Sequence, residues 1–269
     1  MELNRTGPIV KMMETSAIID NLNIIGTTTS GNGLYWDASG TSLHSSISNS
    51  HIISNNGCMD LLNHVNLKGE NDICEGNIRI ENSNVNFSGL RDGSVISGNS
   101  PIVSIDMPDG NSLLHLHNPI DIDLTLATIT TGSSIEEAYD INVQVVNQNQ
   151  RGVPFSSMSV SFNQFNLGVI ATTNYYGSYD LSDYIAREWT DAGSSAWTEV
   201  TIECEYSGTS NTTGAIIFND NKFIYCYLDL VNQPPFIIWQ TPSNNEIYSS
   251  GAQIMFNASE SWDLDNDVL

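Results

Sequence analysis

Short apolar stretches separated by Asn, Ser, Gly and Asp fill residues 16–123, and they lack the 3.6-residue periodicity of helices. Within this segment a tetrapeptide of the form Asn-x-x-Ile or Asn-x-x-Val recurs at unequal spacing. Its copies begin at Asn21, Asn49, Asn82 and Asn99. Asn suits a turn because it tolerates left-handed backbone and both donates and accepts hydrogen bonds. The recurrence therefore predicts stacked coils whose turns vary in length.

Each copy follows an alternating stretch, such as Asn77–Ile80 or Ser94–Ser97, and the alternation predicts an all-β fold. This arrangement resembles the right-handed parallel β-helix repeats of pectate-lyase-like and surface proteins. The resemblance implies a partial β-helix over residues 1–130, with Asn side chains stacked in a ladder that bonds the turn backbone. An antiparallel β-sandwich is the alternative, because it permits the same alternation.

Alternating strands also dominate residues 136–231. Tyr139–Val146 and Ser157–Phe162 flank a turn with the sequence Gly-x-Pro. Together with Ala171–Leu181 they resemble the carboxypeptidase-regulatory-like, transthyretin-type sandwiches, although Asn174 stands where that family usually has Asp. The resemblance implies a β-sandwich over residues 136–231.

Two further strands are predicted in this sandwich, at Trp197–Tyr206 and Phe223–Leu230, and one short helical turn at residues 180–187. The cysteines form two local pairs, Cys58 with Cys74 and Cys204 with Cys226. Disulfides at both pairs would place the protein outside a reducing cytosol. Four buried free thiols are the alternative, which an even count leaves open.

Four Asn-x-Ser/Thr sequons are candidate glycosylation sites of a secreted protein, although a chain rich in Asn, Ser and Thr also produces such triplets by chance. They are Asn4, Asn86, Asn211 and Asn257.

Two consecutive prolines stiffen the linker Val231–Pro235. The segment 233–269 resembles the first half of a PKD-type, immunoglobulin-like module, in which Pro-Pro opens the first strand and Ser-x-Asp-x-Asp-x-Asp-x-Leu follows the second. Here that motif is Ser261–Leu269. The family continues into a Trp-bearing strand, so we expect this polypeptide to be a piece of a longer one.

Three alternating aspartates in this last stretch, Asp263, Asp265 and Asp267, form a candidate Ca²⁺ site. At about 4 Å and an effective dielectric constant near 20, two carboxylates repel by about 4 kcal/mol. A bound Ca²⁺ would relieve this repulsion. A solvated acidic turn is the alternative, since the stretch lacks the Gly and the distal Glu of an EF-hand. Ca²⁺ is the one cofactor that the sequence indicates.

The balance of 31 acidic against 8 basic residues gives a net charge of -23. Nucleic acids and anionic membrane surfaces are therefore excluded as expected partners, because both require clustered Lys and Arg. No run of 18 apolar residues predicts a transmembrane helix, and the N-terminus lacks the apolar core of a signal peptide. An extracellular or cell-surface protein would then carry its signal peptide outside this fragment.

His115 and His117 lie two residues apart, a spacing known from metal sites, but Asp106 and Asp109 nearby do not complete an identifiable ligand set. A pair of surface or turn histidines is the favoured interpretation. Catalysis by a β-helix would need paired carboxylates or a basic lyase residue. The candidate carboxylates of that segment are Asp106, Asp109, Asp121 and Asp123, and no Asp-Asp, Gly-His-Gly or Arg-x-Lys motif accompanies them.

The sequence therefore predicts a non-enzymatic, secreted or cell-surface modular protein that acts in adhesion, presentation or envelope structure, with glycans or envelope proteins as partners. The alternative is a secreted polysaccharide-active enzyme, a β-helix lyase or hydrolase with accessory sandwich modules. Carboxylates from successive coils that converge beside aromatic residues would favour the enzyme. A surface lined by Asn, Ser and Thr would favour the binding protein.

Overall fold

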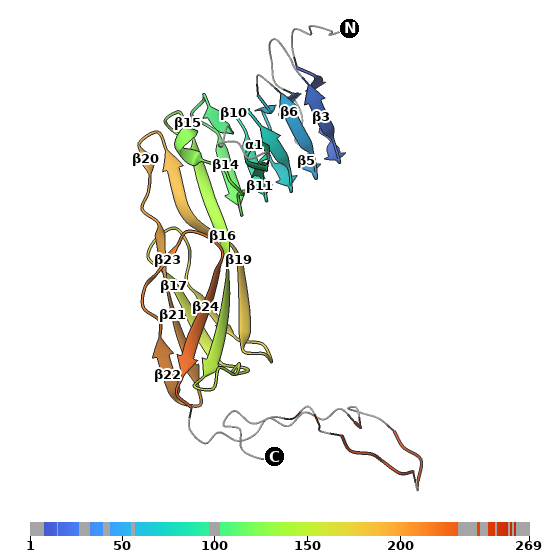
Figure 1. Ribbon diagram of the computed structural model, residues 1–269, viewed down its shortest axis with the longest axis vertical. Helices are drawn as coiled ribbons and strands as arrows, with labels where there is room; N and C mark the ends of the chain where they lie inside the picture. The colour runs from blue at the N-terminus through green and yellow to red at the C-terminus, as the bar shows by residue number, and fades with distance from the viewer. Residues whose placement is uncertain are drawn as a thin grey trace. The chain divides into compact units, whose positions relative to one another are not determined.

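The computed structural model describes residues 8–14, 16–26, 33–39, 44–54, 57–96, 103–230, 241–242, 247–250, 252–257, 259 and 261. It is nearly all β, and its contacts divide the chain into two compact units (Figure 1). Unit 1 comprises Met1–Asp140, Ser182–Thr198 and Ile217–Asn221. Unit 2 comprises Ile141–Leu181, Glu199–Ile216 and Lys222–Leu269.

Unit 1 is built mainly from parallel strands in three sheets, to which successive coils of the chain add their strands, and one antiparallel pair lies at an edge of the second sheet. The first sheet has the order β1 (Val10–Met13), β4 (Leu34–Asp37), β7 (Met59–Leu62), β10 (Asn77–Glu81), β13 (Ser104–Met107) and β15 (Thr128–Ile129). The second has the order β2 (Ile18–Asp20), β5 (Ser45–Ser48), β8 (Leu67–Glu70), β11 (Asn84–Ser88), β14 (Leu113–His117) and β16 (Ser134–Asn147), followed by β19 (Ser178–Thr190) and β20 (Gly193–Ser194). The third contains β3 (Asn23–Gly26), β6 (His51–Ser54), β9 (Ile73–Glu75) and β12 (Arg91–Asp92). Two short helices, α1 (Gly93–Ile96) and η1 (Leu124–Leu126), interrupt the coils.

Alternate residues of these strands form one continuous apolar core. Trp36, Ile47, Ile78 and Leu116 are fully buried in it, whereas the residues between them face outward. Burying each such side chain contributes about 1.5–3 kcal/mol. The period-two alternation seen in the sequence is therefore the inside-to-outside alternation of the coils, except at Ser94–Ile96, which belong to α1 and not to a strand.

Neighbouring coils are fitted to one another in shape. Phe87 of β11 lies opposite Gly69 of β8 in the register of the second sheet. A Cβ atom on Gly69 would lie 1.9 Å from Cδ1 of Phe87. The Phe87 ring of one coil therefore occupies the space that a side chain at position 69 of the preceding coil would need.

Asparagines with left-handed backbone occupy the turns between the sheets. The φ angles of Asn21, Asn49 and Asn82 are 56°, 50° and 48°, which confirms the predicted left-handed turns at these three copies. Asn21 and Asn49 follow second-sheet strands, but Asn82 follows a first-sheet strand. The tetrapeptides thus belong to two kinds of turn, one after the second sheet and one after the first. Both kinds contain Asn because both require the same left-handed backbone conformation. Asn99 lies outside the described residues.

A ladder of hydrogen bonds links coils through side chains that accept from the backbone of the preceding coil. Leu22 N–H donates to Ser50 Oγ at 3.2 Å, and Ser50 N–H donates to Asp72 Oδ1 at 2.9 Å. Ser50 Oγ in turn donates to the carbonyl of Ser48. Each ladder residue therefore satisfies a buried backbone donor that would otherwise lack a partner.

Each unit contains one disulfide, and the pairs are those expected from the sequence. Cys58 and Cys74 are bridged with their Cα atoms 5.7 Å apart, and Cys204 and Cys226 with their Cα atoms 6.3 Å apart. All four residues are buried. The bridges stabilise each unit by restricting its unfolded chain.

Unit 2 contains antiparallel strands with one parallel pair. β17 (Ser157–Phe162), β18 (Val169–Thr172), β21 (Thr198–Tyr206), β22 (Thr209–Thr212) and β23 (Ile216–Phe218) form a sheet in which β17 pairs with β18 and β21. β24 (Lys222–Leu228) pairs in parallel with Ile141–Asn147 of β16. Parallel sheets in unit 1 and antiparallel strands in unit 2 are compatible with the predicted β-helix and sandwich.

The predicted helical turn at residues 180–187 is wrong, because this segment belongs to strand β19. Asp183 has a φ of 65°, which no right-handed helix accommodates. Ala186 is fully buried between partly exposed neighbours. Pairing with β16 outweighs the local helix propensity of the segment.

Candidate functional site

The predicted calcium ligands Asp263, Asp265 and Asp267 lie outside the described residues. Among the residues that the structure describes, no group of three or more His, Cys, Asp or Glu side chains is arranged to hold a metal ion.

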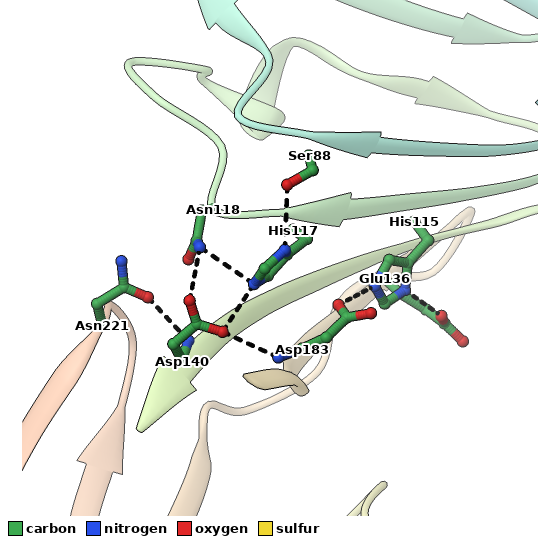
Figure 2. A network of polar contacts seen from close by, with 8 residues as sticks. All are labelled: Ser88, His115, His117, Asn118, Glu136, Asp140, Asp183 and Asn221. Carbon is green, nitrogen blue, oxygen red and sulfur yellow. Dashed lines mark hydrogen bonds and ion pairs between the residues drawn. The ribbon is translucent and has the colours of Figure 1, made fainter. Parts of the chain in front are cut away.

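The two histidines of β14 are held by hydrogen bonds to carboxylates on other strands of unit 1 (Figure 2). His115 Nδ1 lies 2.8 Å from Glu136 Oε2, and its Nε2 lies 2.6 Å from Asp183 Oδ1. Glu136 is opposite His115 in the register of β14 and β16. Both ring nitrogens of His115 are engaged, so this residue is a structural ion-pair partner.

His117 is held in a similar way at the C-terminal end of the same strand. Its Nε2 lies 2.8 Å from Asp140 Oδ1 and its Nδ1 lies 3.2 Å from Ser88 Oγ. Asp140 also accepts from the Asn118 side chain and from the Asp183 backbone N–H. Burial opposes ionisation of Asp140, but the hydrogen bonds from Asn118 and His117 outweigh burial and lower its pKa. Figure 2 shows this carboxylate at the centre of the network.

The aspartates that the sequence placed near the histidines have other roles. Asp109 accepts from Asn82 N–H and from Ser112 Oγ, so it supports a turn. Asp123 accepts from Thr125 N–H at the start of η1, and Asp121 lies 3.7 Å from Arg91. Asp106 lies on the outer face of the first sheet. The structure therefore does not gather the four candidate carboxylates into one site.

Protonation of His115 is expected to make the stability of unit 1 depend on pH. Burial alone would lower the pKa of His115, but the hydrogen bonds to Glu136 and Asp183 outweigh burial and raise it. A raised pKa means that the stabilisation is complete below the unfolded pKa of about 6.5 and is lost as pH rises through the folded pKa. We expect H115Q to remove this pH dependence and to cost about 1 kcal/mol at pH 6.

Urea unfolding of H115Q and wild type between pH 5.5 and 9 measures the effect. The exposed His44 provides the matched control, H44Q. Parallel curves for wild type and H115Q across that pH range would contradict the assignment.

A buried ionic cluster, which sequence reasoning missed, lies at the last coil of unit 1. Glu137 is only 6% exposed. It lies opposite Leu116 in the register of β14 and β16, at a position that faces the core. Its carboxylate accepts hydrogen bonds from Tyr139 Oη at 2.7 Å, Arg187 Nη2 at 3.2 Å and Trp189 Nε1 at 3.2 Å. The guanidinium of Arg187 stacks on Trp189 and on Trp197. Trp189 also packs against the apolar core, so the cluster closes this end of the coil stack.

A row of charged and polar residues crosses the outer face of the first sheet. In the register of adjacent strands it runs Lys11, Tyr35, Asp60, Arg79, Asp106 and Thr128. Adjacent strands are about 4.8 Å apart, so Asp60 and Asp106 flank Arg79. Arg79 also forms an ion pair with Glu81 at 2.6 Å. Burial, and then the charges of Asp37 and Asp60, raise the pKa of Tyr35.

Three aromatic side chains project from alternate positions of β24 in unit 2. Phe223, Tyr225 and Tyr227 are 55%, 45% and 49% exposed. Their ring centroids are 4.9 Å apart between Phe223 and Tyr225, and 6.0 Å apart between Tyr225 and Tyr227. We call these three residues the aromatic face.

Neutral polar groups lie on both sides of the aromatic face. Asn142 and Gln144 of β16 are opposite Phe223 and Tyr225 in the parallel register, so their side chains point to the same side of the sheet. On the other side the face borders a groove of about 400 Å³. The groove is lined by Asn211, Thr212, Thr213, Ile216, Lys222, Phe223, Ile224, Tyr225 and Tyr227.

The other side of β24 fixes the aromatic face in place. Ile224, Cys226 and Leu228 alternate with the three rings along β24 and are buried on its opposite side. Cys226 is bridged to Cys204 of β21. Asn211 Nδ2 donates to the Tyr227 carbonyl at 2.7 Å. A disulfide and a side-chain hydrogen bond therefore hold the strand that carries the rings.

The predicted glycosylation sites have different environments. Asn86 is half-buried on the outer side of β11, and Asn211 lines the groove beside the aromatic face. Asn257 Oδ1 accepts from Ser259 N–H. Asn4 lies outside the described residues.

Among the described residues, no helix has the length and apolar character needed to cross a membrane. No protein-family model matches the sequence, and no curated protein matches it as a relative.

Proposed function

We propose that this protein is a non-enzymatic, secreted or cell-surface modular protein that acts in adhesion or presentation, and that the aromatic face of unit 2 contacts its ligand. The proposed architecture is a right-handed parallel β-helix over residues 1–130, a carboxypeptidase-regulatory-like sandwich over 136–231, and the start of a PKD-like module over 233–269. The successive parallel strands of unit 1 support the β-helix, and the antiparallel pairs of unit 2 support the sandwich.

The exposed aromatic face is the observation that carries this proposal. Three large rings in a row are costly to leave in water, and exposed aromatic groups beside polar side chains are typical of interaction sites. The two buried disulfides support an oxidising, extracellular location. The histidine and arginine clusters of unit 1 are engaged in ion pairs, as structural groups are.

Removing rings from the aromatic face is expected to abolish adhesion. Beads coated with the purified protein would be tested for attachment to isolated cell envelopes and extracellular matrix. The double variant F223A/Y225A is expected to reduce attachment at least tenfold, because interface rings carry most of the binding energy. Tyr176, which is 72% exposed elsewhere in unit 2, provides the matched control Y176A. Equal attachment by wild type and the double variant would overturn the proposal.

The charged row on the first sheet favours a second candidate function, polysaccharide cleavage. Asp60 and Asp106 come from different coils, flank Arg79, and have Tyr35 beside them. Carboxylates about 6.5–9.5 Å apart suit inverting hydrolysis. Release of reducing ends from a polysaccharide by wild type, lost in D60N/D106N, would establish this function; no release leaves the binding protein as the sole candidate.

A further inference from the structure

We propose that the ligand of the aromatic face is a neutral polysaccharide whose chain runs along β24. This inference rests on the proposed function and names the chemistry of its ligand. Its starting point is the spacing of the rings, because alternate residues of one strand present them in a row with centroids 4.9 Å and 6.0 Å apart. These intervals are comparable with the length of one pyranose residue, so a sugar chain can run along the row, although the planes of neighbouring rings are inclined to each other by 63° and 32°.

The chemistry beside the rings matches sugar hydroxyl groups. Gln144 borders the face on one side, and Thr212 and Thr213 line the groove on the other. The Asn142 and Asn211 amides beside them already donate within the protein, to Asp180 and to the Tyr227 carbonyl. Carboxamides and hydroxyls both donate and accept hydrogen bonds, as sugar hydroxyls do. The rings contribute apolar surface for the C–H faces of the sugars. A ligand with one apolar face and polar edges fits this arrangement of rings between amides and hydroxyls.

Charge selects a neutral chain over an acidic one. Lys222 is the one charged residue among those that line the groove, and Asp180 accepts a hydrogen bond from Asn142 at the opposite border. The whole chain carries a net charge of -23. Uronate-rich polysaccharides and nucleic acids would be repelled at low ionic strength. Binding of a neutral chain should therefore change little with salt.

Rigidity of the face reduces the entropic cost of binding. The Cys204–Cys226 bridge lies directly behind the rings, and the Asn211 side chain holds the backbone at Tyr227. Tyrosine and phenylalanine lose little conformational freedom because each has two side-chain torsions. The aromatic face is therefore pre-organised for binding.

Affinity gel electrophoresis tests the proposal with soluble polysaccharides as the probes. Mixed-linkage β-glucan, galactomannan, arabinoxylan and starch provide neutral chains, and polygalacturonate and hyaluronan provide acidic ones. We expect retardation by at least one neutral chain and by neither acidic chain, unchanged between 50 and 500 mM NaCl. Y225A is expected to weaken the retardation at least tenfold, whereas Y225F, which keeps the ring, should retain most of it. Y176A serves as the matched control, and circular dichroism confirms that each variant folds.

The bead assay separates failure of this inference from failure of the proposed function. One outcome is that F223A/Y225A loses attachment but no neutral polysaccharide binds the protein or competes with attachment. The polysaccharide inference is then overturned and the adhesive function stands, with a protein as the ligand. If a neutral polysaccharide binds at the face but beads do not attach to any surface, the adhesive function is overturned and the inference stands. Binding that Y225A leaves unchanged overturns the assignment to this face.

Discussion

The variant E137A is expected to lower the free energy of unfolding of unit 1 by about 3–5 kcal/mol, because it leaves a partly buried guanidinium without its carboxylate. Glu137 is 6% exposed and accepts hydrogen bonds from Tyr139, Arg187 and Trp189. Removing it leaves the hydroxyl and the indole N–H without this acceptor as well. Urea unfolding followed by tryptophan fluorescence measures the loss, since Trp189 and Trp197 lie beside the cluster.

A double-mutant cycle distinguishes an ionic contact from a general packing defect. R187A alone should also destabilise, because it leaves the Glu137 carboxylate with neutral donors only. E137A/R187A should cost less than the sum of the two single variants, since neither charge then remains buried alone. The exposed Glu199 provides the matched control E199A, expected to change stability by less than about 0.5 kcal/mol. Strict additivity would refute direct coupling between Glu137 and Arg187.

The second large effect is a gain of stability, expected when the buried Asp72 is replaced by serine. Asp72 is fully buried, and its Oδ2 has no hydrogen-bond partner among the described residues. Burial raises the pKa of Asp72 to about 6. Because the folded pKa lies above the unfolded value, the stability that the neutral acid gives is present at low pH and is lost as pH rises through about 6. The cost of the buried carboxylate reaches about 3 kcal/mol at neutral pH.

D72S should remove this cost and repeat the chemistry of Ser50 in the neighbouring coil. A serine Oγ at position 72 can accept from Ser50 N–H and donate to the Glu70 carbonyl, as Ser50 Oγ does toward Ser48. We expect D72S to exceed wild type by about 2–3 kcal/mol at pH 7.5 and to match it near pH 4. Urea midpoints measured from pH 4 to 8 test this, with D229S at an exposed position as the control. A stability difference that is constant with pH would disprove the buried-acid explanation.

Local chemistry in the sequence predicts much of the fold. Ser157–Phe162 was predicted as a strand and is β17, and the alternation at Tyr139–Val146 lies within β16. The left-handed turns at Asn21, Asn49 and Asn82 were also predictable, because they depend on one residue's own conformational preference. Which turn each Asn occupies was not predictable, since that depends on how the coils stack.

Long-range partners set the limit of the sequence analysis. The carboxylates that hold His115 come from Glu136, one coil later, and from Asp183 on β19, whose strand pairing the local sequence did not reveal. Counting one coil forward from His115 would have found Glu136. The aromatic face had a local signal, because Phe223, Tyr225 and Tyr227 alternate with residues that are buried. Its amide neighbours Asn142 and Gln144 required the parallel pairing of β16 with β24.

The contact between Gly69 and Phe87 affects how this chain can evolve in length. Repeat proteins commonly grow or shrink by duplicating or deleting whole units, which works when every unit fits every other. Here Phe87 fills a space that exists only because the preceding coil has no side chain at position 69. A duplicated β11 coil would place a second Phe87 against the first, and deletion of the β8 coil would place Phe87 against Ile47. The β8 and β11 coils can therefore be duplicated or deleted only together.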